Sequence, residues 1–222
     1  MNGQIIQLLV LAGIAVFLIL RLRSVLGTRD GFEKPPMTGG ETPDRPVAKR
    51  PEFDVIEGGP DRDITDYVDD GSDAAKALAA MKLADRDFNV REFLEGARGA
   101  YEMILMAFER GDLTEVRSFL SEEVAESFDA VIADRNAQGL TIEASFIGVR
   151  EVNLSDASFD RGSSEGEVSV RFVGELTSVV KNADGEIVEG DATEIKRQKD
   201  VWTFARVMGS DDPNWQLVAT SE

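Results

Sequence analysis

Residues 90–111 read VREFLEGARGAYEMILMAFERG, and this stretch decides the fold. Its apolar residues recur at spacings of three and four, which is the period of an α-helix with one face turned toward a core. The residues of this stripe are Val90, Phe93, Leu94, Ala97, Tyr101, Ile104, Leu105 and Phe108. Gly111 then supplies a common C-terminal stop. The stretch therefore predicts a long helix packed against another layer of structure.

Helical patterns flank this stretch on both sides. Upstream, residues 74–88 read AAKALAAMKLADRDF and predict an Ala-rich helix of three to four turns. Downstream, Asp112 and Glu115 resemble a capping box and predict a short helix. Ser121, followed by two glutamates, predicts the start of a further helix that ends near Gly139. The first half of the domain is thus predicted to be helical.

From residue 141 the period changes from helical to alternating. Apolar residues alternate with polar ones, as in half-buried strands, at Ile142, Ala144 and Phe146 and again at Val168, Val170 and Phe172. Asn-Ala-Asp-Gly at 182–185 predicts a hairpin turn that leads into a strand at residues 186–188. Residues 201–207 and 215–219 predict two more strands. Helices followed by antiparallel strands predict an α+β domain.

The first twenty residues, MNGQIIQLLVLAGIAVFLIL, carry no charged side chain. A helix over residues 3–22 is long enough to cross the ~30 Å hydrocarbon core of a bilayer. Arg21, Arg23 and Arg29 follow it, so the positive-inside rule predicts an outside N-terminus and a cytoplasmic remainder. No basic segment precedes the apolar run, and no cleavage site follows it. Residues 1–26 are therefore predicted to be an uncleaved transmembrane anchor rather than a signal peptide or a buried core helix.

The stretch after the anchor, residues 27–72, has the composition of a disordered tether. It holds six of the seven prolines and few large apolar residues, so it cannot bury enough surface to offset its ordering entropy. Two short apolar islands, Phe53–Ile56 and Ile64–Val68, are either docking motifs or incidental linker residues. The remaining residues, 73–222, are predicted to form one folded domain.

Composition restricts the chemistry and the partners. The chain has 42 acidic and 24 basic residues, a net charge of −18, and neither cysteine nor histidine. Disulfides, thiolate or imidazole metal sites and Cys or His catalysis are therefore excluded. An acidic body repels nucleic acid, which leaves basic or apolar protein segments as the natural partners.

The remaining chemical motifs are weak. Paired carboxylates occur at Asp69-Asp70, Glu122-Glu123 and Asp211-Asp212, and none has the spacing of a calcium-binding loop. Two Gly-Gly pairs lie in the tether without the strand and Lys-Ser/Thr of a phosphate loop. The sequence therefore predicts no enzymatic activity, no metal and no cofactor.

Both halves of the domain resemble a known family. The matching segments are Phe93–Arg98, Ala100–Ile104, Ala107-Phe108, Gly111–Leu113, Leu120–Val124, Phe128, Arg135, Gly139, Asp200–Arg206 and Asp212–Thr220. They resemble the TimA family of bacterial membrane proteins. That family shares its C-terminal, Tim44-like domain with the matrix-side scaffold of the mitochondrial inner-membrane import motor. The resemblance covers about residues 75–222 and extends to the layout of anchor and tether.

The resemblance implies a curved antiparallel sheet wrapped around helices, a cone-like fold similar to nuclear-transport-factor-two-like domains, with an apolar crevice. It implies a membrane-anchored adaptor or scaffold at the bacterial inner membrane. Its partners would be inner-membrane proteins or a DnaK-type chaperone, in the service of protein transport. The chain departs from the mitochondrial scaffold in having only the tether where that protein has a long region that engages chaperone and channel.

Six aromatic residues are the candidates for lining such a crevice: Tyr101, Phe146, Phe172, Trp202, Phe204 and Trp215. Plain core packing is the alternative for each of them, and Tyr101 in particular is expected to be a core residue with a satisfied hydroxyl. Related cone-shaped folds include isomerases that use an Asp base and a Tyr donor, so a small-ligand-binding or isomerase-like domain is the alternative function. An apolar crevice open to the surface favours the adaptor. A closed pocket with an acid beside a tyrosine favours the alternative.

Overall fold

The computed structural model describes residues 61–221. The predicted anchor, residues 1–26, and the tether up to residue 60 lie outside the described residues. Within residues 61–221, none of the helices has the length and apolar character needed to cross a membrane.

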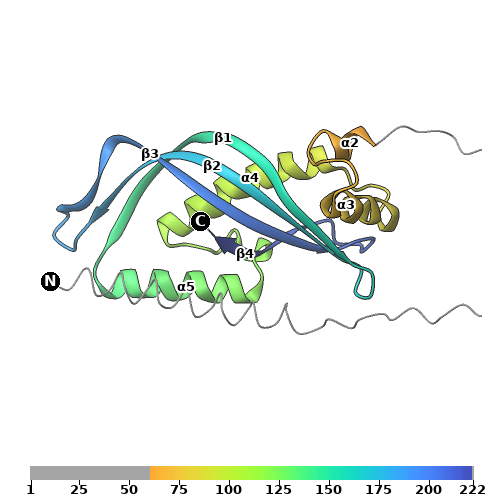
Figure 1. The fold of residues 1–222 in the computed structure, drawn as a ribbon. Coiled ribbons are helices and arrows are strands. Elements are labelled where there is room, and N and C mark those ends of the chain that lie inside the picture. The colour runs from red at the N-terminus through yellow and green to blue at the C-terminus, as the bar shows by residue number, and fades with distance from the viewer. Residues whose placement is uncertain (1–60, 222) are drawn as a thin grey trace, which may run out of the picture. The chain divides into compact units, whose positions relative to one another are not determined.

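The described chain has the predicted order, with helices first and strands after them (Figure 1). The helices are α2 (Arg62–Thr65), α3 (Asp73–Ala84), α4 (Val90–Arg110), the 3-10 turn η1 (Arg117–Phe119) and α5 (Glu122–Ala137). Local caps account for their ends. Asn89 accepts a hydrogen bond from the backbone N–H of Glu92, and Gly111 ends α4 in the left-handed conformation at φ 76°. The predicted helix over residues 90–110 is confirmed.

The strands form one antiparallel sheet in the order β1-β2-β3-β4. They are β1 (Thr141–Asp160), β2 (Glu165–Lys181), β3 (Ile187–Val207) and β4 (Gln216–Ser221). Three register shifts interrupt the pairing of β1 with β2, and such bulges bend strands. Figure 1 shows the first three strands arching over the helices. The α+β architecture with helices on the concave side of a curved sheet agrees with the prediction.

One predicted helix is only a single turn. The capping box expected at Asp112 and Glu115 does not form: the Asp112 carboxylate accepts from the N–H of Thr114, and the regular part of this segment is η1. Leu113 and Val116 are both buried. Both residues precede η1, and the backbone N–H of Val116 donates to the carbonyl of Leu113 at 3.1 Å, so a turn rather than a longer helix places them in the core.

The predicted tether is wrong over residues 61–72, which form part of the domain. Ile64 in α2 is 5% exposed, and Val68 packs against the core. The Asp63 carboxylate accepts hydrogen bonds from the backbone of α4. These two contacts compensate for the poor composition of the segment, so the apolar island Ile64–Val68 is a packing element. The folded part of the described chain therefore includes residues 61–72.

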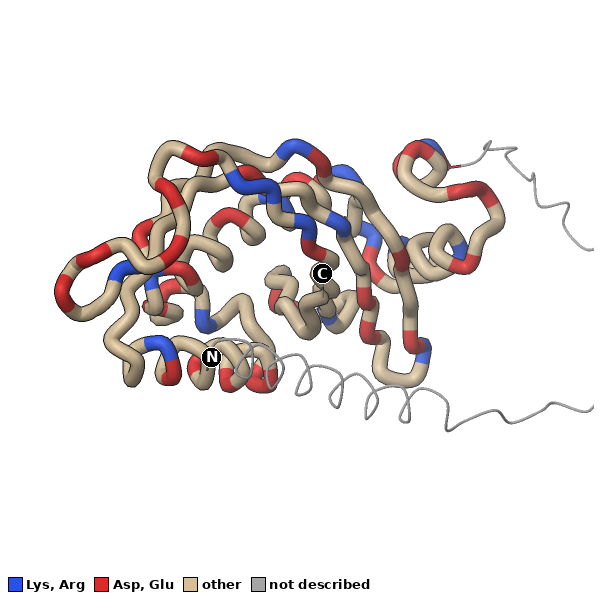
Figure 2. The backbone as a smooth tube through the Cα atoms, turned by 60° about the vertical axis from the view of Figure 1, so that its left-hand side comes forward, with Lys and Arg blue, Asp and Glu red and all other residues tan. Residues whose placement is uncertain are grey.

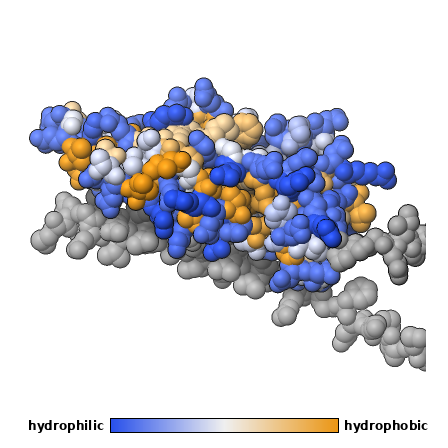
Figure 3. Space-filling view, turned by 90° about the horizontal axis from the view of Figure 1, so that it is seen from above, coloured by the Kyte–Doolittle hydropathy of each residue, from blue (hydrophilic) through white to orange (hydrophobic). Residues whose placement is uncertain are grey.

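The outer face of the sheet carries no helix among the described residues and is largely hydrophilic, with scattered apolar groups (Figure 3). At its centre Glu175 is 4% exposed and accepts hydrogen bonds from Arg150 at 2.8 Å and Arg197 at 3.0 Å. The hydrogen bond from Arg150, followed by that from Arg197, holds the pKa of Glu175 below its ordinary value. Figure 2 shows basic residues in the middle of the strands, while acidic residues mark the β2–β3 hairpin and α5.

Candidate functional site

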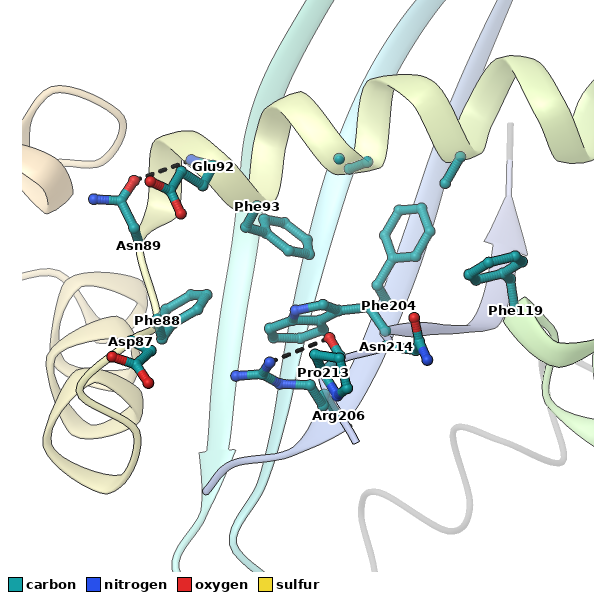
Figure 4. A pocket seen from close by; sticks show the side chains of 14 residues that line it. Asp87, Phe88, Asn89, Glu92, Phe93, Phe119, Phe204, Arg206, Pro213 and Asn214 are labelled. Carbon is teal, nitrogen blue, oxygen red and sulfur yellow. Dashed lines mark hydrogen bonds between the residues drawn. The ribbon is translucent and has the colours of Figure 1, made fainter. Parts of the chain in front are cut away.

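A groove opens beside the N-terminal half of α4. Its volume is about 310 Å³, and its walls come from α4, the α3–α4 connection, η1, β3 and the β3–β4 connection. Five aromatic side chains line it: Phe88, Phe93, Phe119, Phe204 and Trp215. Figure 4 shows Phe93 and Phe204 extending into the space below α4, with Phe88 at one end and Phe119 at the other. We call this feature the aromatic groove.

The aromatic rings pack on one another at the end of the groove nearest Phe88. The ring centroids of Phe93 and Trp215 are 4.6 Å apart, and those of Phe88 and Trp215 are 5.7 Å apart. Phe93 also meets Phe204 edge to face at 6.0 Å. Such contacts hold large rings in defined positions. The result is a preformed apolar surface that can receive an apolar side chain from a partner.

Arg206 ties two walls of the groove together. Its guanidinium lies 5.3 Å from the ring centroid of Trp215, forms an ion pair with Asp85 and donates to the carbonyl of Pro213 at 3.2 Å. Asp85 ends α3, whereas Pro213 belongs to the β3–β4 connection. The Nε of Arg206 is buried and has no hydrogen-bond partner among the described residues. The cation therefore fixes Trp215 from one side of its ring.

The rim of the groove is polar and acidic. Asp87, Asn89, Glu92 and Asn214 line it (Figure 4). Along α4 the wall is made of small residues, and a Cβ added to Gly96 would meet nothing within 4 Å. Small residues let another backbone approach closely. The groove thus suits a peptide segment that places an apolar side chain among the rings and a basic one near the rim carboxylates.

The structure divides the six predicted crevice residues into two groups. Phe204 and Trp215 line the aromatic groove. Tyr101, Phe172 and Trp202 are at most 4% exposed and do not line the groove. Their cluster adjoins Phe204, which is 2% exposed and whose ring centroid is 6.3 Å from that of Trp202. Phe146 is half-buried and adjoins this cluster, 6.3 Å from Tyr101 between ring centroids. For these four residues core packing, the alternative reading of the sequence, is what the structure shows.

Tyr101 has a buried acidic partner. Its hydroxyl donates to Oδ2 of Asp200 at 2.5 Å, and Gln198 donates to the other carboxylate oxygen at 3.1 Å. Burial, and then the hydrogen bond to Asp200, raise the pKa of Tyr101 far above its ordinary value. The Tyr101 ring also packs closely against the backbone of Gly174. A Cβ added to Gly174 would lie only 2.8 Å from the hydroxyl oxygen, so only glycine leaves room for the ring there. The expectation of a core tyrosine with a satisfied hydroxyl is confirmed.

This pair bears on the choice between the two functions. An acid beside a tyrosine is expected in a ligand-binding or isomerase-like site, and Tyr101 and Asp200 form such a pair. However, Tyr101 is 0% and Asp200 6% exposed, and neither lines the aromatic groove. To act as a catalytic base and a hydrogen-bond donor, Asp200 and Tyr101 would have to contact a substrate, and their burial prevents this. The groove that is open to the surface is apolar, which is the feature expected of the adaptor.

The sequence pattern does not distinguish several of the groove residues. It places Phe93 in the core, where the residue is 7% exposed, but the Phe93 ring also forms a groove wall. Phe88, Phe119 and Arg206 gave no periodic signal. For Asp200 a signal existed, because it stands two residues before Trp202 on the inward-facing positions of the strand. An acid on the apolar face of a strand indicates a buried partner.

Comparison with known proteins gives a family match over most of the described chain. A family model described as "Tim44-like domain" matches residues 74–222. The "Probable mitochondrial import inner membrane translocase subunit tin-44" of Caenorhabditis elegans is 25% identical over 151 residues, which are 66% of this chain and 35% of that protein. The chain therefore spans about a third of the length of this relative.

A solved structure with some likeness is the intermembrane space region of the chloroplast protein ARC6. It has a TM-score of 0.37 and 11% sequence identity, and the match covers 59% of this chain and 92% of that one. A likeness of this size carries no argument about fold or function.

Proposed function

The chain belongs to the Tim44-like domain family, and from this premise we propose that it is a membrane-associated adaptor that holds a protein partner at a membrane. The observation that carries the proposal is the aromatic groove, which is apolar inside, acidic at its rim and open to the surface. The role of its relative in mitochondrial import supports a scaffold in protein transport.

The proposal includes the N-terminal segments. Residues 3–22 would cross the inner membrane of a bacterium once, with Arg21, Arg23 and Arg29 on the cytoplasmic side. Residues 27–60, as a coil, would reach on the order of 30 Å. The domain would then meet only partners near the membrane surface. Confinement of this kind raises the effective concentration, so contacts that are weak in solution become sufficient.

The partner we propose is a protein segment with an apolar anchor and a nearby lysine or arginine. The apolar anchor would fill the space among Phe93, Phe204 and Trp215, and the basic group would face Asp87 and Glu92. The net charge of −18 favours a basic partner over nucleic acid. A DnaK-type chaperone or an inner-membrane protein that carries such a segment fits this description.

Trp215→Ala is predicted to reduce the partner recovered with the chain from membranes at least tenfold. A central aromatic anchor of an interface typically contributes 2 kcal/mol or more, which is about thirtyfold in affinity. The measurement is the affinity of the purified chain for the recovered partner. Leu83→Ala is the matched control, because Leu83 is 86% exposed and lies outside the groove. Equal recovery with both variants would place the partner elsewhere.

Glu92→Lys is predicted to weaken the same interaction and to lower its dependence on salt, because a basic partner would meet a like charge at the rim. Glu95→Lys makes the same change of net charge on the same helix, and Glu95 is exposed outside the groove. Affinities in low and in high salt separate the two variants. If both lose the same amount, net charge and not the rim determines binding.

The second candidate, a small-ligand-binding or isomerase-like domain, is supported only by the Tyr101–Asp200 pair. Tyr101→Phe distinguishes the two functions. An adaptor would keep its partner, because the hydroxyl lies outside the groove. A domain that works through the pair would lose its ligand or its turnover.

A further inference from the structure

The described chain begins with a segment that holds the start of α4. Oδ2 of Asp63 accepts hydrogen bonds from the backbone N–H of Val90 and from Nζ of Lys82, both at 2.8 Å. Oδ1 of Asp63 accepts from the N–H of Arg91 at 3.2 Å. Lys82 also donates to Asp61 at 2.7 Å. An aspartate 27 residues away in the chain thus caps this helix and joins α2, α3 and α4.

Asp63 completes the N-terminal cap of α4. The first backbone N–H groups of a helix lack partners within it. Here the N–H of Glu92 donates to the side chain of Asn89, and that of Phe93 makes the first regular helix hydrogen bond, to the carbonyl of Asn89. The N–H groups of Val90 and Arg91, which lie between, donate to Asp63.

The capped turn is also a wall of the aromatic groove. Asp87, Phe88 and Asn89 come directly before it, Glu92 and Phe93 lie within it, and all five line the groove (Figure 4). The Phe88 and Phe93 rings rest on Trp215 from the β3–β4 connection. A shift at the start of α4 therefore changes the space in which a partner side chain would lie.

The segment that makes these contacts is weakly held. α2 has four residues, too few for a helix to persist without tertiary contacts. Ile64 is its one buried residue, and the rest of its attachment is the pairing of Asp61 and Asp63 with Lys82 and the backbone of α4. A unit with few buried contacts opens more easily than the core. It is also the part of the described domain that directly follows residues 1–60.

We propose that residues 61–66 are a detachable clip that sets the shape of the aromatic groove. With the clip docked, the start of α4 is fixed and Phe88 and Phe93 are held against Trp215. When the clip leaves, two N–H groups lose their acceptor and the wall loosens. By reciprocity, an occupant of the groove strengthens the docking of the clip. The effect of an occupant on the clip rests on the proposed function. The effect of the clip on the shape of the groove does not.

The test is hydrogen exchange of the full chain in detergent micelles, for Asp63→Ala and for Asp73→Ala as the control. Asp73 also pairs with a lysine of α3, but at an exposed site. We expect Asp63→Ala to speed exchange at least fivefold in two places, the amides of residues 90–93 and those of residues 214–217 across the groove. Asp73→Ala should change neither.

Faster exchange at residues 90–93 alone would reduce Asp63 to a local cap and overturn the proposal, as would no change at either place. A global rise in exchange would mean that the variant is unfolded. In that event the variant to measure is Lys82→Ala, which removes the ion pairs but keeps the Asp63 carboxylate as acceptor for the backbone of α4. It should speed exchange at the same two places by a smaller factor. If it does not, the proposal fails. None of these readouts needs a partner, so loss of the proposed function and loss of the clip are distinguishable.

Discussion

Trp202→Ala is expected to lower the free energy of unfolding by about 3 to 5 kcal/mol, the range for removing a large buried ring. Trp202 is 4% exposed. Its ring lies 4.7 Å from that of Tyr101 and 6.0 Å from that of Phe172, measured between centroids. The space left by the indole is lined by rings that are themselves held by the sheet and α4, so it cannot collapse. Denaturant unfolding followed by circular dichroism measures the loss.

Trp215→Ala is the matched comparison for this prediction. It removes the same side chain from a half-buried position at the groove. The loss of stability should be clearly smaller than for Trp202→Ala, whereas the loss of partner binding should be larger. Equal losses of stability for the two variants would show that the groove is as closed as the core.

Asp200→Ala is expected to cost about 1 to 3 kcal/mol, because it leaves the buried Tyr101 hydroxyl without an acceptor. Tyr101→Phe removes the donor and should cost less on its own, since the ring still packs. The double variant should then cost less than the sum of the two single ones. Strictly additive losses in the double-mutant cycle would mean that the hydrogen bond contributes nothing to stability.

The same pair predicts a loss of stability at high pH. Burial and Asp200 raise the pKa of Tyr101 in the folded chain, while in the unfolded chain it stays near 10. The stabilisation is therefore complete below pH 10 and is lost as the pH rises above that value. Unfolding measured at pH 8 and pH 11 should show a smaller decrease for Tyr101→Phe than for the unchanged chain. An identical decrease would contradict the assigned state of Tyr101.

The helices could be predicted from the sequence because their signals are local. The apolar stripe of residues 90–108, the stop at Gly111 and the cap at Ser121 all act within a few residues. The strands were harder. β3 begins at Ile187, where the turn at 182–185 predicts a returning strand over residues 186–188. Its unbroken run to the predicted strand at 201–207 could not be predicted, because residues 189–195 are exposed and lack an apolar alternation. Only their pairing with β2 makes these residues a strand. Pairing of this kind cannot be recognised from the local pattern of apolar residues.

The candidate site could be predicted only in part, for a related reason. Trp202 and Phe204 stand two residues apart on the same face of β3, so the sequence predicts the same environment for both. In the fold, Tyr101 of α4 covers Trp202, whereas Phe204 lies beside the open groove. The partner that fixes Arg206 is Asp85, 121 residues away. Such contacts follow from the arrangement of whole elements rather than from spacing along the chain.

The most direct test of the adaptor is photo-crosslinking in intact membranes, with a photoreactive amino acid in place of Asn214, an exposed residue of the groove, in the full chain and in place of Leu83 as the control. We predict a crosslink to one protein partner from position 214, absent from position 83 and strongly reduced when residues 1–26 are deleted. No protein crosslink from position 214 above the control would contradict the account, as would a crosslink that persists unchanged without residues 1–26.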